Sequence, residues 1–216
     1  MGIYRRASHR AKPSLPWPAH DLPLNAPSSF ITRAMVRGVF RKDTADRRSI
    51  TACFTGHRII AKDDLPLIET RLDVLLEELY CKGYRDFISG AALGFDILAA
   101  EHVLHLKSRH SDVRLILAIP CADQTARWHR VDCMHYERLL FACDDIRVLA
   151  KAYYDGCMQV RNQFMVDSSS MCICYLKHFR GGTLATVKYA VQQDIPVLNV
   201  LIDDKSAVPS AAIHAD

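Results

Sequence analysis

The sequence lacks any apolar stretch of the roughly 18–20 residues that a membrane-spanning helix needs. Its start does not show a charged segment followed by an apolar one, which is the pattern of a secretion signal. It also lacks the G-x-G-x-x-G dinucleotide fingerprint and the lysine-containing phosphate-binding loop G-x-x-x-x-G-K-[ST]. We therefore expect a cytoplasmic protein with no membrane partner that is neither an ordinary dehydrogenase nor a triphosphate-hydrolysing enzyme.

Eight cysteines are present, but their spacing matches no paired motif. Most lie within or beside apolar runs, where free thiols pack as small hydrophobic groups. Cys172 and Cys174 form a C-x-C pair on one face of a predicted strand, without the further Cys or His that a zinc site requires. We expect reduced thiols in the core and no metal site.

Positive charge is concentrated at the start of the chain. Residues 1–49 hold ten Lys or Arg and three Asp or Glu, whereas residues 50–216 hold 18 and 21. The remainder of the chain is therefore mildly acidic, and nucleic acid is a candidate partner for the N-terminal segment alone.

Three parts of the chain are predicted from composition. Residues 12–27 contain five prolines in 16 positions, which excludes helix and sheet interiors. We interpret residues 1–48 as a basic, proline-rich extension, with a short helix over residues 29–41. A solvated tail is expected, and a targeting peptide or a nucleic-acid-binding arm are the alternatives. The domain proper spans residues 49–203, and residues 204–216 form a short tail.

Short apolar runs alternate with segments of helical periodicity throughout the predicted domain. Runs that are apolar on both faces are typical of parallel strands covered by helices. The predicted fold class is α/β, a Rossmann-like, doubly wound, mainly parallel sheet of about six strands with helices on both faces. Strands are expected at 49–56, 86–90, 113–120, 145–150, 171–176 and 195–200, and helices at 67–83, 94–110, 123–143, 157–169 and 183–194.

Ligands of such sheets bind beyond the carboxyl ends of the strands, so the strand-to-helix turns are informative. The first such turn is "TGHR", residues 55–58. Gly56 allows close backbone approach, while Thr55, His57 and Arg58 supply a hydroxyl, an imidazole and a permanent cation. This cluster suits a phosphate or a ribose, or is a glycine turn with exposed polar residues.

The second turn is "SGAALGFD", residues 89–96, which begins with Ser89. Gly90 and Gly94 bracket a loop that enters a helix, whose N-terminal N–H groups point toward the strand ends. Asp96 in the first helical turn either offsets the helix dipole or accepts hydrogen bonds from ribose hydroxyls.

The third turn is "RGGT", residues 180–183. Gly181 and Gly182 can turn backbone amides toward an anion, and Arg180 adds positive charge. Thr183 either caps the following helix or bonds a phosphate oxygen. After the fourth predicted strand, Tyr153 and Tyr154 either stack a base or pack against the protein.

These motifs in this order resemble the SLOG superfamily of Rossmann-like proteins, which includes the DprA and LOG proteins, and most closely its YpsA-like branch. The resemblance covers residues 49–200 and depends on "TGHR", "SGAALGFD", "AAE" at 99–101, "RN" at 161–162 and "GGT" at 181–183. It implies a nucleotide or an NAD- or ADP-ribose-like ligand at the strand ends, with the last glycine loop at a phosphate.

LOG-like enzymes release a base from a nucleoside monophosphate; they carry an R-K pair on one helix and the loop P-G-G-x-G-T-x-x-E, and the Arg and the Glu do the cleavage. Here Arg161 matches the Arg, Asn162 replaces the Lys, and Thr186 stands three residues after Thr183, where the loop has Glu. Threonine cannot stabilise an oxocarbenium-like state or activate water at pH 7. Only another carboxylate, Asp96, Asp155 or Asp167, could replace the missing Glu.

The sequence therefore predicts a protein that binds or senses a nucleotide-derived small molecule, with no assigned reaction. A LOG-like N-glycosidic hydrolase is the alternative, and DprA-like DNA binding through the N-terminal tail is a third hypothesis. A homo-oligomer is compatible with each. The predicted ligand-binding residues are Thr55, Gly56, His57, Arg58, Ser89, Gly90, Gly94, Asp96, Arg161, Asn162, Gly181, Gly182 and Thr183.

Overall fold

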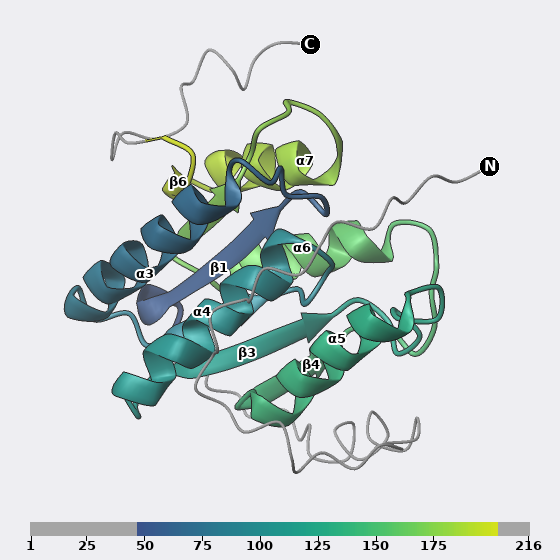
Figure 1. Ribbon diagram of the computed structural model, residues 1–216. Coiled ribbons are helices and arrows are strands. Elements are labelled where there is room, and N and C mark those ends of the chain that lie inside the picture. Colours follow the sequence, from purple (N-terminus) through teal and green to yellow (C-terminus); the bar gives the residue numbers. More distant parts are fainter. Residues whose placement is uncertain (1–46, 203–216) are drawn as a thin grey trace.

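The computed structural model describes residues 47–202. These residues form a single sheet in the order β4-β3-β2-β1-β5-β6, with parallel pairing between all neighbours (Figure 1). The predicted α/β, Rossmann-like fold class is confirmed. The strands are β1 Thr51–Gly56, β2 Asp86–Ser89, β3 Arg114–Ile119, β4 Asp145–Val148, β5 Met171–Tyr175 and β6 Val197–Asn199.

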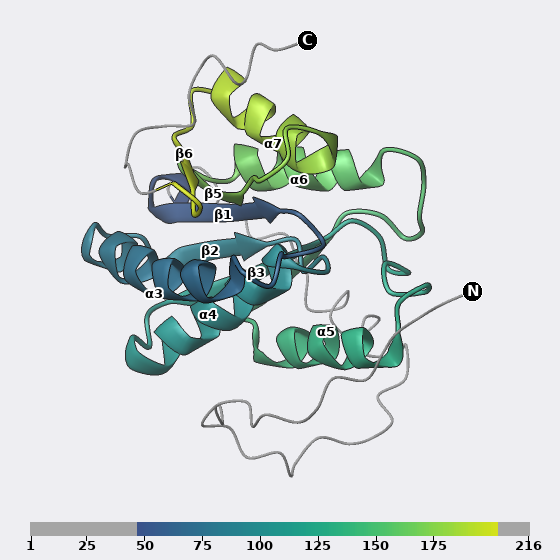
Figure 2. The ribbon, with the colours of Figure 1, turned by 45° about the horizontal axis from the view of Figure 1, so that its top comes forward.

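Helices cover both faces of this sheet, as Figure 2 shows. One face carries three helices and the other carries two, so the sheet is buried between two apolar layers. The first group is α3 Leu65–Cys81, α4 Phe95–Arg109 and α5 Arg130–Ala142; the second is α6 Cys157–Asp167 and α7 Gly181–Gln192. A short 3-10 helix, η1 Arg48–Ile50, precedes β1.

Apolar side chains at helical spacing attach the helices to the sheet. In α3 the side chains of Ile68, Leu72, Leu76 and Leu79 are buried on one stripe. The C-x-C pair of β5 is buried in the core beneath α6 and α7, which confirms its predicted packing role. Cys81, in contrast, is exposed at the end of α3.

The predicted helix over 123–143 starts later than expected. It begins at Arg130, because side chains in the preceding segment bond to other turns instead of continuing a helix. Asp123 accepts a hydrogen bond from the Tyr153 N–H at 2.9 Å, and Gln124 Nε2 donates to the Ala91 carbonyl at 3.1 Å. These contacts join the turn after β3 to the turns after β4 and β2.

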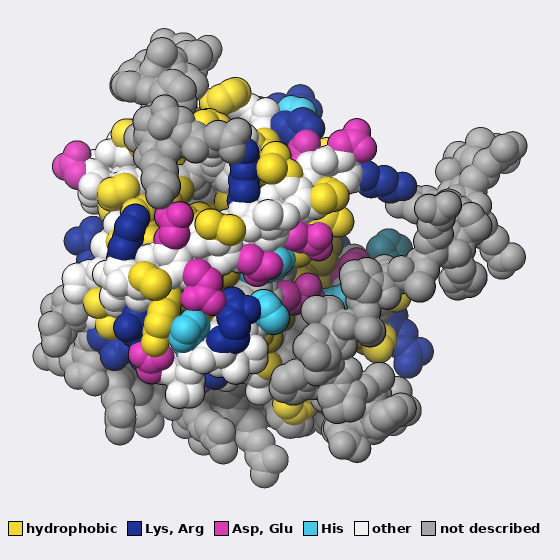
Figure 3. Space-filling view, turned by 60° about the vertical axis from the view of Figure 1, so that its left-hand side comes forward, with side chains coloured by type: hydrophobic (Ala, Val, Ile, Leu, Met, Phe, Trp, Pro, Cys, Tyr) yellow, Lys and Arg dark blue, Asp and Glu magenta, His cyan; other side chains and the backbone are white. Residues whose placement is uncertain are grey.

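The surface over α3 and α4 carries both signs of charge. Figure 3 shows Lys and Arg side chains interspersed with Asp and Glu on the described part of this face, instead of one continuous basic patch. Several of these charges are paired across helices, for example Arg109 with Glu77 at 2.7 Å. Within residues 47–202 the helices are too short or too polar to cross a bilayer. The proline-rich segment and the predicted helix over 29–41 lie outside the described residues.

Candidate functional site

The strand order reverses between β1 and β5, which makes this edge of the sheet the candidate position for a ligand crevice. From β1 the chain adds β2, β3 and β4 on one side, whereas β5 and β6 lie on the other side. Because all strands are parallel, the turns after β1, β2 and β5 leave from the same edge of the sheet (Figure 1). Doubly wound sheets bind ligands at this edge, where the strand order reverses.

A buried ion pair lies beside the turn after β2, near this candidate crevice. Arg161 of α6 and Asp96 of α4 are each 5% exposed, and Arg161 Nη1 lies 3.7 Å from Asp96 Oδ2. The same Nη1 donates a 2.6 Å hydrogen bond to the Gly90 carbonyl. A Cβ on Gly90 would lie 1.6 Å from Nη1, so this position has no room for a side chain. The structure thus brings together three residues that the sequence predicted for one site.

Burial changes the titration of both charged groups. Desolvation raises the pKa of Asp96 from 3.8 to about 6, and the opposing attraction of Arg161 offsets this only in part. Burial likewise lowers the pKa of Arg161, while Asp96 acts to raise it. A buried carboxyl group with a raised pKa and a specific charged partner is a candidate functional residue.

A chain of hydrogen bonds connects this floor to the glycine loop. Arg161 Nε donates to Asn162 Oδ1 at 2.7 Å, and Asn162 Nδ2 donates to Thr186 Oγ1 at 2.7 Å. Thr186 Oγ1 in turn donates to the Gly182 carbonyl at 2.8 Å. Thr186 is 3% exposed, so its hydroxyl joins α6 to the first turn of α7 inside the protein.

Replacing Thr186 with valine should destabilise the protein by about 1–3 kcal/mol, because the Asn162 amide and the Gly182 carbonyl both lose a buried partner. Thr70→Val is the matched control. Thr70 Oγ1 makes the same helical contact, to the Pro66 carbonyl at 2.9 Å, but is exposed to water. Urea denaturation of both variants measures the change in unfolding free energy. Equal decreases in the two variants would show that the hydrogen bonds from Thr186 to Asn162 and Gly182 contribute nothing to stability.

The glycine loop is open to solvent. Gly181 has a φ of +76°, and a Cβ on either Gly181 or Gly182 would meet no atom of the described chain within 4 Å. Because α7 starts at Gly181, Thr183 lies inside the first helical turn and is 7% exposed. Of the two roles expected for Thr183, capping is excluded because the N-cap is Arg180, and the bond to a phosphate oxygen stays a prediction. The residue before the helix, Arg180, is in an extended conformation.

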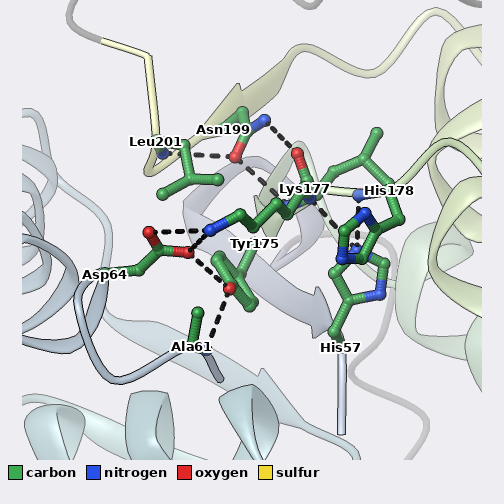
Figure 4. A network of polar contacts seen from close by, with 9 residues as sticks. His57, Ala61, Asp64, Tyr175, Lys177, His178, Asn199 and Leu201 are labelled. Atoms are coloured by element: carbon green, nitrogen blue, oxygen red, sulfur yellow. Dashed lines mark hydrogen bonds and ion pairs between the residues drawn. The ribbon is translucent and has the colours of Figure 1, made fainter. Parts of the chain in front are cut away.

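His57 holds the loop that leads to these glycines (Figure 4). Its Nε2 accepts hydrogen bonds from the backbone N–H groups of Lys177 at 3.1 Å and His178 at 3.0 Å. Burial lowers the pKa of His57, and the nearby His178 and Arg180 lower it further. The neutral imidazole is the form that can accept at Nε2, so this environment favours the contact. His57 therefore holds the backbone of the loop after β5 in place through these two hydrogen bonds.

The other side of the same loop is held by residues that the sequence reasoning missed. Asn199 of β6 bonds both the N–H and the carbonyl of Leu176, and Asp64 accepts from Lys177 Nζ at 2.8 Å and from the Tyr175 hydroxyl at 2.8 Å (Figure 4). Neither Asn199 nor Asp64 lies in a recognisable motif. The role of Asn199 depends on the pairing of β5 with β6. The role of Asp64 depends on the connection from β1 to α3, which brings its carboxylate to Tyr175 and Lys177.

Three further predicted residues shape the turns. Thr55 is 4% exposed within β1. A Cβ on Gly56 would lie 2.4 Å from the Cβ of Phe95, so this glycine allows α4 to pack closely against β1. Ser89 Oγ donates to the Asp96 carbonyl at 2.8 Å and accepts from the Ala91 N–H at 3.1 Å. Gly56 and Ser89 thus stabilise the packing of α4 and its preceding turn against the sheet, and Thr55 is buried within β1.

Arg58 and Gly94 lie on the outer side of the crevice. Arg58 is exposed, and with Gly94 it lines a groove of about 370 Å³ between α4 and α5. Glu101 of the "AAE" motif and His135 line the same groove, with Glu101 Oε1 3.2 Å from His135 Nδ1. Arg58 is also close enough to the Arg161–Asp96 pair to act on it, because its charge acts to lower the pKa of Asp96 and of Arg161.

Among the three carboxylates that could replace the missing Glu, Asp96 is the one that contacts Arg161. Asp155 is exposed and accepts from the Tyr153 hydroxyl at 3.3 Å. Asp167 ends α6 at the opposite edge of the sheet, where the Tyr189 hydroxyl donates to it at 2.9 Å.

Gln124 is a buried polar residue that sequence reasoning missed, because it fell within a predicted helix. It is 9% exposed, and its Oε1 has no hydrogen-bond partner among residues 47–202. Its Nε2 bonds the Ala91 carbonyl beside Gly90. It therefore adds a polar group to the β2 end of the crevice.

A doubly wound parallel sheet with glycine turns at its reversal point defines a Rossmann-like α/β protein. The model of the YspA SLOG family (YpsA) matches residues 58–197, which is more than half of the chain. The protein belongs to this family, and the resemblance stated from its motifs is confirmed.

Relatives by sequence include the SPbeta prophage-derived protein YoqJ of Bacillus subtilis, 32% identical over 57% of this chain and 80% of that protein. Another is UPF0398 protein BH1768 of Halalkalibacterium halodurans, 30% identical over 47% of this chain. The match spans 52% of the length of BH1768.

Solved structures of DNA processing protein A have the same fold. The Helicobacter pylori protein, whose structure describes a single-stranded DNA binding mode, has a TM-score of 0.52 at 19% identity, over 73% of this chain and 67% of that chain. The Streptococcus pneumoniae protein has a TM-score of 0.50 at 16% identity, over 69% and 49% of the two chains. At these identities the likeness concerns the fold alone.

Proposed function

We propose that this protein binds a nucleotide or a nucleotide-derived small molecule, of the NAD or ADP-ribose type, in the crevice between β1 and β5. The buried Arg161 carries the proposal, because a guanidinium fixed near the strand ends and linked to Gly182 through Asn162 and Thr186 favours an anionic ligand. Hydrogen bonds to Gly90 and Asn162 use two of its N–H donors. The exposed Arg58 and Arg180 add positive charge on the flanking turns.

The ligand is held without being cleaved. At the position of the LOG-like Glu, this chain has Thr186, whose hydroxyl is engaged between Asn162 and Gly182. At the position of the LOG-like Lys, this chain has Asn162, whose Oδ1 accepts a hydrogen bond from Arg161 Nε. Neither side chain can act as a general base at neutral pH.

Calorimetry on the full chain tests binding against NAD, ADP-ribose, AMP and cyclic nucleotides. Arg161→Ala and Gly182→Asp should weaken binding at least about tenfold, the second by placing a negative charge where a phosphate would lie. Gly182→Asp adds its side chain in open space, so the fold is retained. Arg109→Ala, at the far end of α4, is the control and should bind normally. Failure of every one of these ligands to bind would refute the proposal.

Hydrolysis of a nucleoside monophosphate is the second candidate, and one observation favours it. Asp96 contacts Arg161, and burial brings its pKa to about 6, within the range useful for acid–base chemistry near neutral pH. Prolonged incubation with AMP should then release adenine and ribose 5-phosphate, and Asp96→Asn should abolish the release. Intact AMP after incubation would leave binding as the function.

Single-stranded DNA is the competing ligand, because the similar Helicobacter pylori protein binds it. The acidic balance of residues 50–216 opposes a DNA-binding face on the domain, so binding would depend on the basic N-terminal segment. DNA binding that weakens with salt and disappears when residues 1–46 are removed would support this alternative.

A further inference from the structure

We infer that the crevice recognises the base of its ligand by stacking on Phe179, the residue that precedes the "RGGT" turn. This inference rests on the proposed function and adds the chemical feature that the site selects, a planar aromatic ring next to a phosphate. Phe179 is 55% exposed although it is a large apolar side chain. It lies in the connection from β5 to α7, at the edge of the sheet where the strand order reverses.

The backbone at Phe179 forms a tight turn. The Arg180 N–H donates to the His178 carbonyl at 2.8 Å, so Phe179 occupies the middle of a three-residue turn. Such a turn directs the central side chain away from the backbone on either side. Gly181 and Gly182 follow after one residue, Arg180, so the ring and the open glycine amides lie close together along the chain.

The residues before this turn are fixed on two sides, as Figure 4 shows. Leu176 is bonded at its N–H and its carbonyl by Asn199, and the N–H groups of Lys177 and His178 both donate to His57 Nε2. An exposed aromatic ring on a backbone that is already ordered loses little conformational entropy when a ligand binds. This is the property expected of a stacking platform.

A second exposed apolar side chain lies on the facing loop. Ile59 is 84% exposed and comes two residues after His57. The rings of His57 and His178 are 5.5 Å apart, so the loops that carry Ile59 and Phe179 are in contact at their bases. Apolar groups on both loops, next to the exposed Arg58 and Arg180 on the same loops, match a nucleotide, which combines a flat apolar base with a charged phosphate.

The two exposed tyrosines are less well placed. Tyr153 and Tyr154 follow β4, the edge strand, which is separated from β1 by β3 and β2. The Tyr153 hydroxyl also bonds Asp155 within its own loop. Phe179 is therefore the residue that we assign to the base.

The test compares two ligands on the full chain: the adenine nucleotide that binds most tightly among AMP, ADP-ribose and NAD, and ribose 5-phosphate, which has no base. Phe179→Ala should weaken nucleotide binding about 5- to 150-fold, the range of base–aromatic stacking, and leave ribose 5-phosphate unaffected. Phe179→Trp should restore binding and show indole fluorescence quenching on addition of the nucleotide. Tyr154→Ala, an equally accessible aromatic on another loop, is the control.

Three results would overturn the inference. Equal weakening of both ligands by Phe179→Ala would indicate that the substitution disturbs the loop. Unchanged nucleotide binding by Phe179→Ala would show that the ring makes no contact with the base. Weaker nucleotide binding by Tyr154→Ala alone would indicate that the base binds at the β4 edge of the sheet. In each of these cases Arg161→Ala still reports on the proposed function, because that variant should lose ribose 5-phosphate as well.

Discussion

Replacing Gly90 with alanine should displace Arg161 and weaken nucleotide binding. The new Cβ would lie 1.6 Å from Arg161 Nη1 and 2.6 Å from Asp96 Oδ2, so the guanidinium must leave its contact with the Gly90 carbonyl. A buried charge that loses its partners costs about 3–5 kcal/mol. We expect a loss of about 3 kcal/mol in unfolding free energy and at least about tenfold weaker ligand binding.

Two further variants separate this effect from a general effect of adding a methyl group. Gly182→Ala introduces the same methyl at a glycine with open space around it, and should leave stability within about 0.5 kcal/mol. In the Arg161→Ala background, Gly90→Ala should lose at least about half of its effect on stability, because the clashing side chain is gone. Additive losses would mean that Gly90 acts independently of Arg161.

Gly94→Ala should have the largest effect on stability. Gly94 has a φ of +85° and a ψ of −123°, and its Cβ would lie 2.4 Å from the carbonyl oxygen of Arg58 and 2.5 Å from that of His57. These are backbone atoms, so no side-chain rotation can relieve the contact. Backbone strain and overpacking together predict a loss of about 4 kcal/mol in urea denaturation.

Gly83→Ala is the matched control for this substitution. Gly83 has a similar φ of +96°, but its Cβ would meet no atom of the described chain within 4 Å. The cost there is the strain alone, about 1–2 kcal/mol. If the two variants lost the same stability, the close approach of α4 to the "TGHR" turn would be energetically unimportant.

The site also explains why the departures from the LOG-like pattern occur together. Asn162 and Thr186 replace a lysine and a glutamate, and the two new side chains bond each other at 2.7 Å. A motif lysine and the glutamate that takes part in cleavage are thus replaced by a pair that joins α6 to α7. This coupling supports a site that holds its ligand in place.

Much of the fold could be predicted because periodicity is local. The buried stripe of α3 repeats every three or four residues, and the strands are short apolar runs, so both element types can be identified from neighbouring residues. The segment 123–129 was predicted wrongly because its backbone conformation depends on Tyr153 and Ala91, which are distant in sequence.

The amino-acid pattern was sufficient for the α/β class, the family, and the strand-to-helix turns at one edge of the sheet, because glycines and charged residues follow the strand ends in a recognisable order. The assignment of partners required the tertiary structure. His57 was predicted to contact a ligand, but its Nε2 is occupied by the loop amides of Lys177 and His178. Thr186 was notable in sequence only for replacing a glutamate, and in the folded chain it bonds Gly182 and Asn162. Such contacts join residues far apart in the chain, and their geometry exists only once the sheet has brought them together.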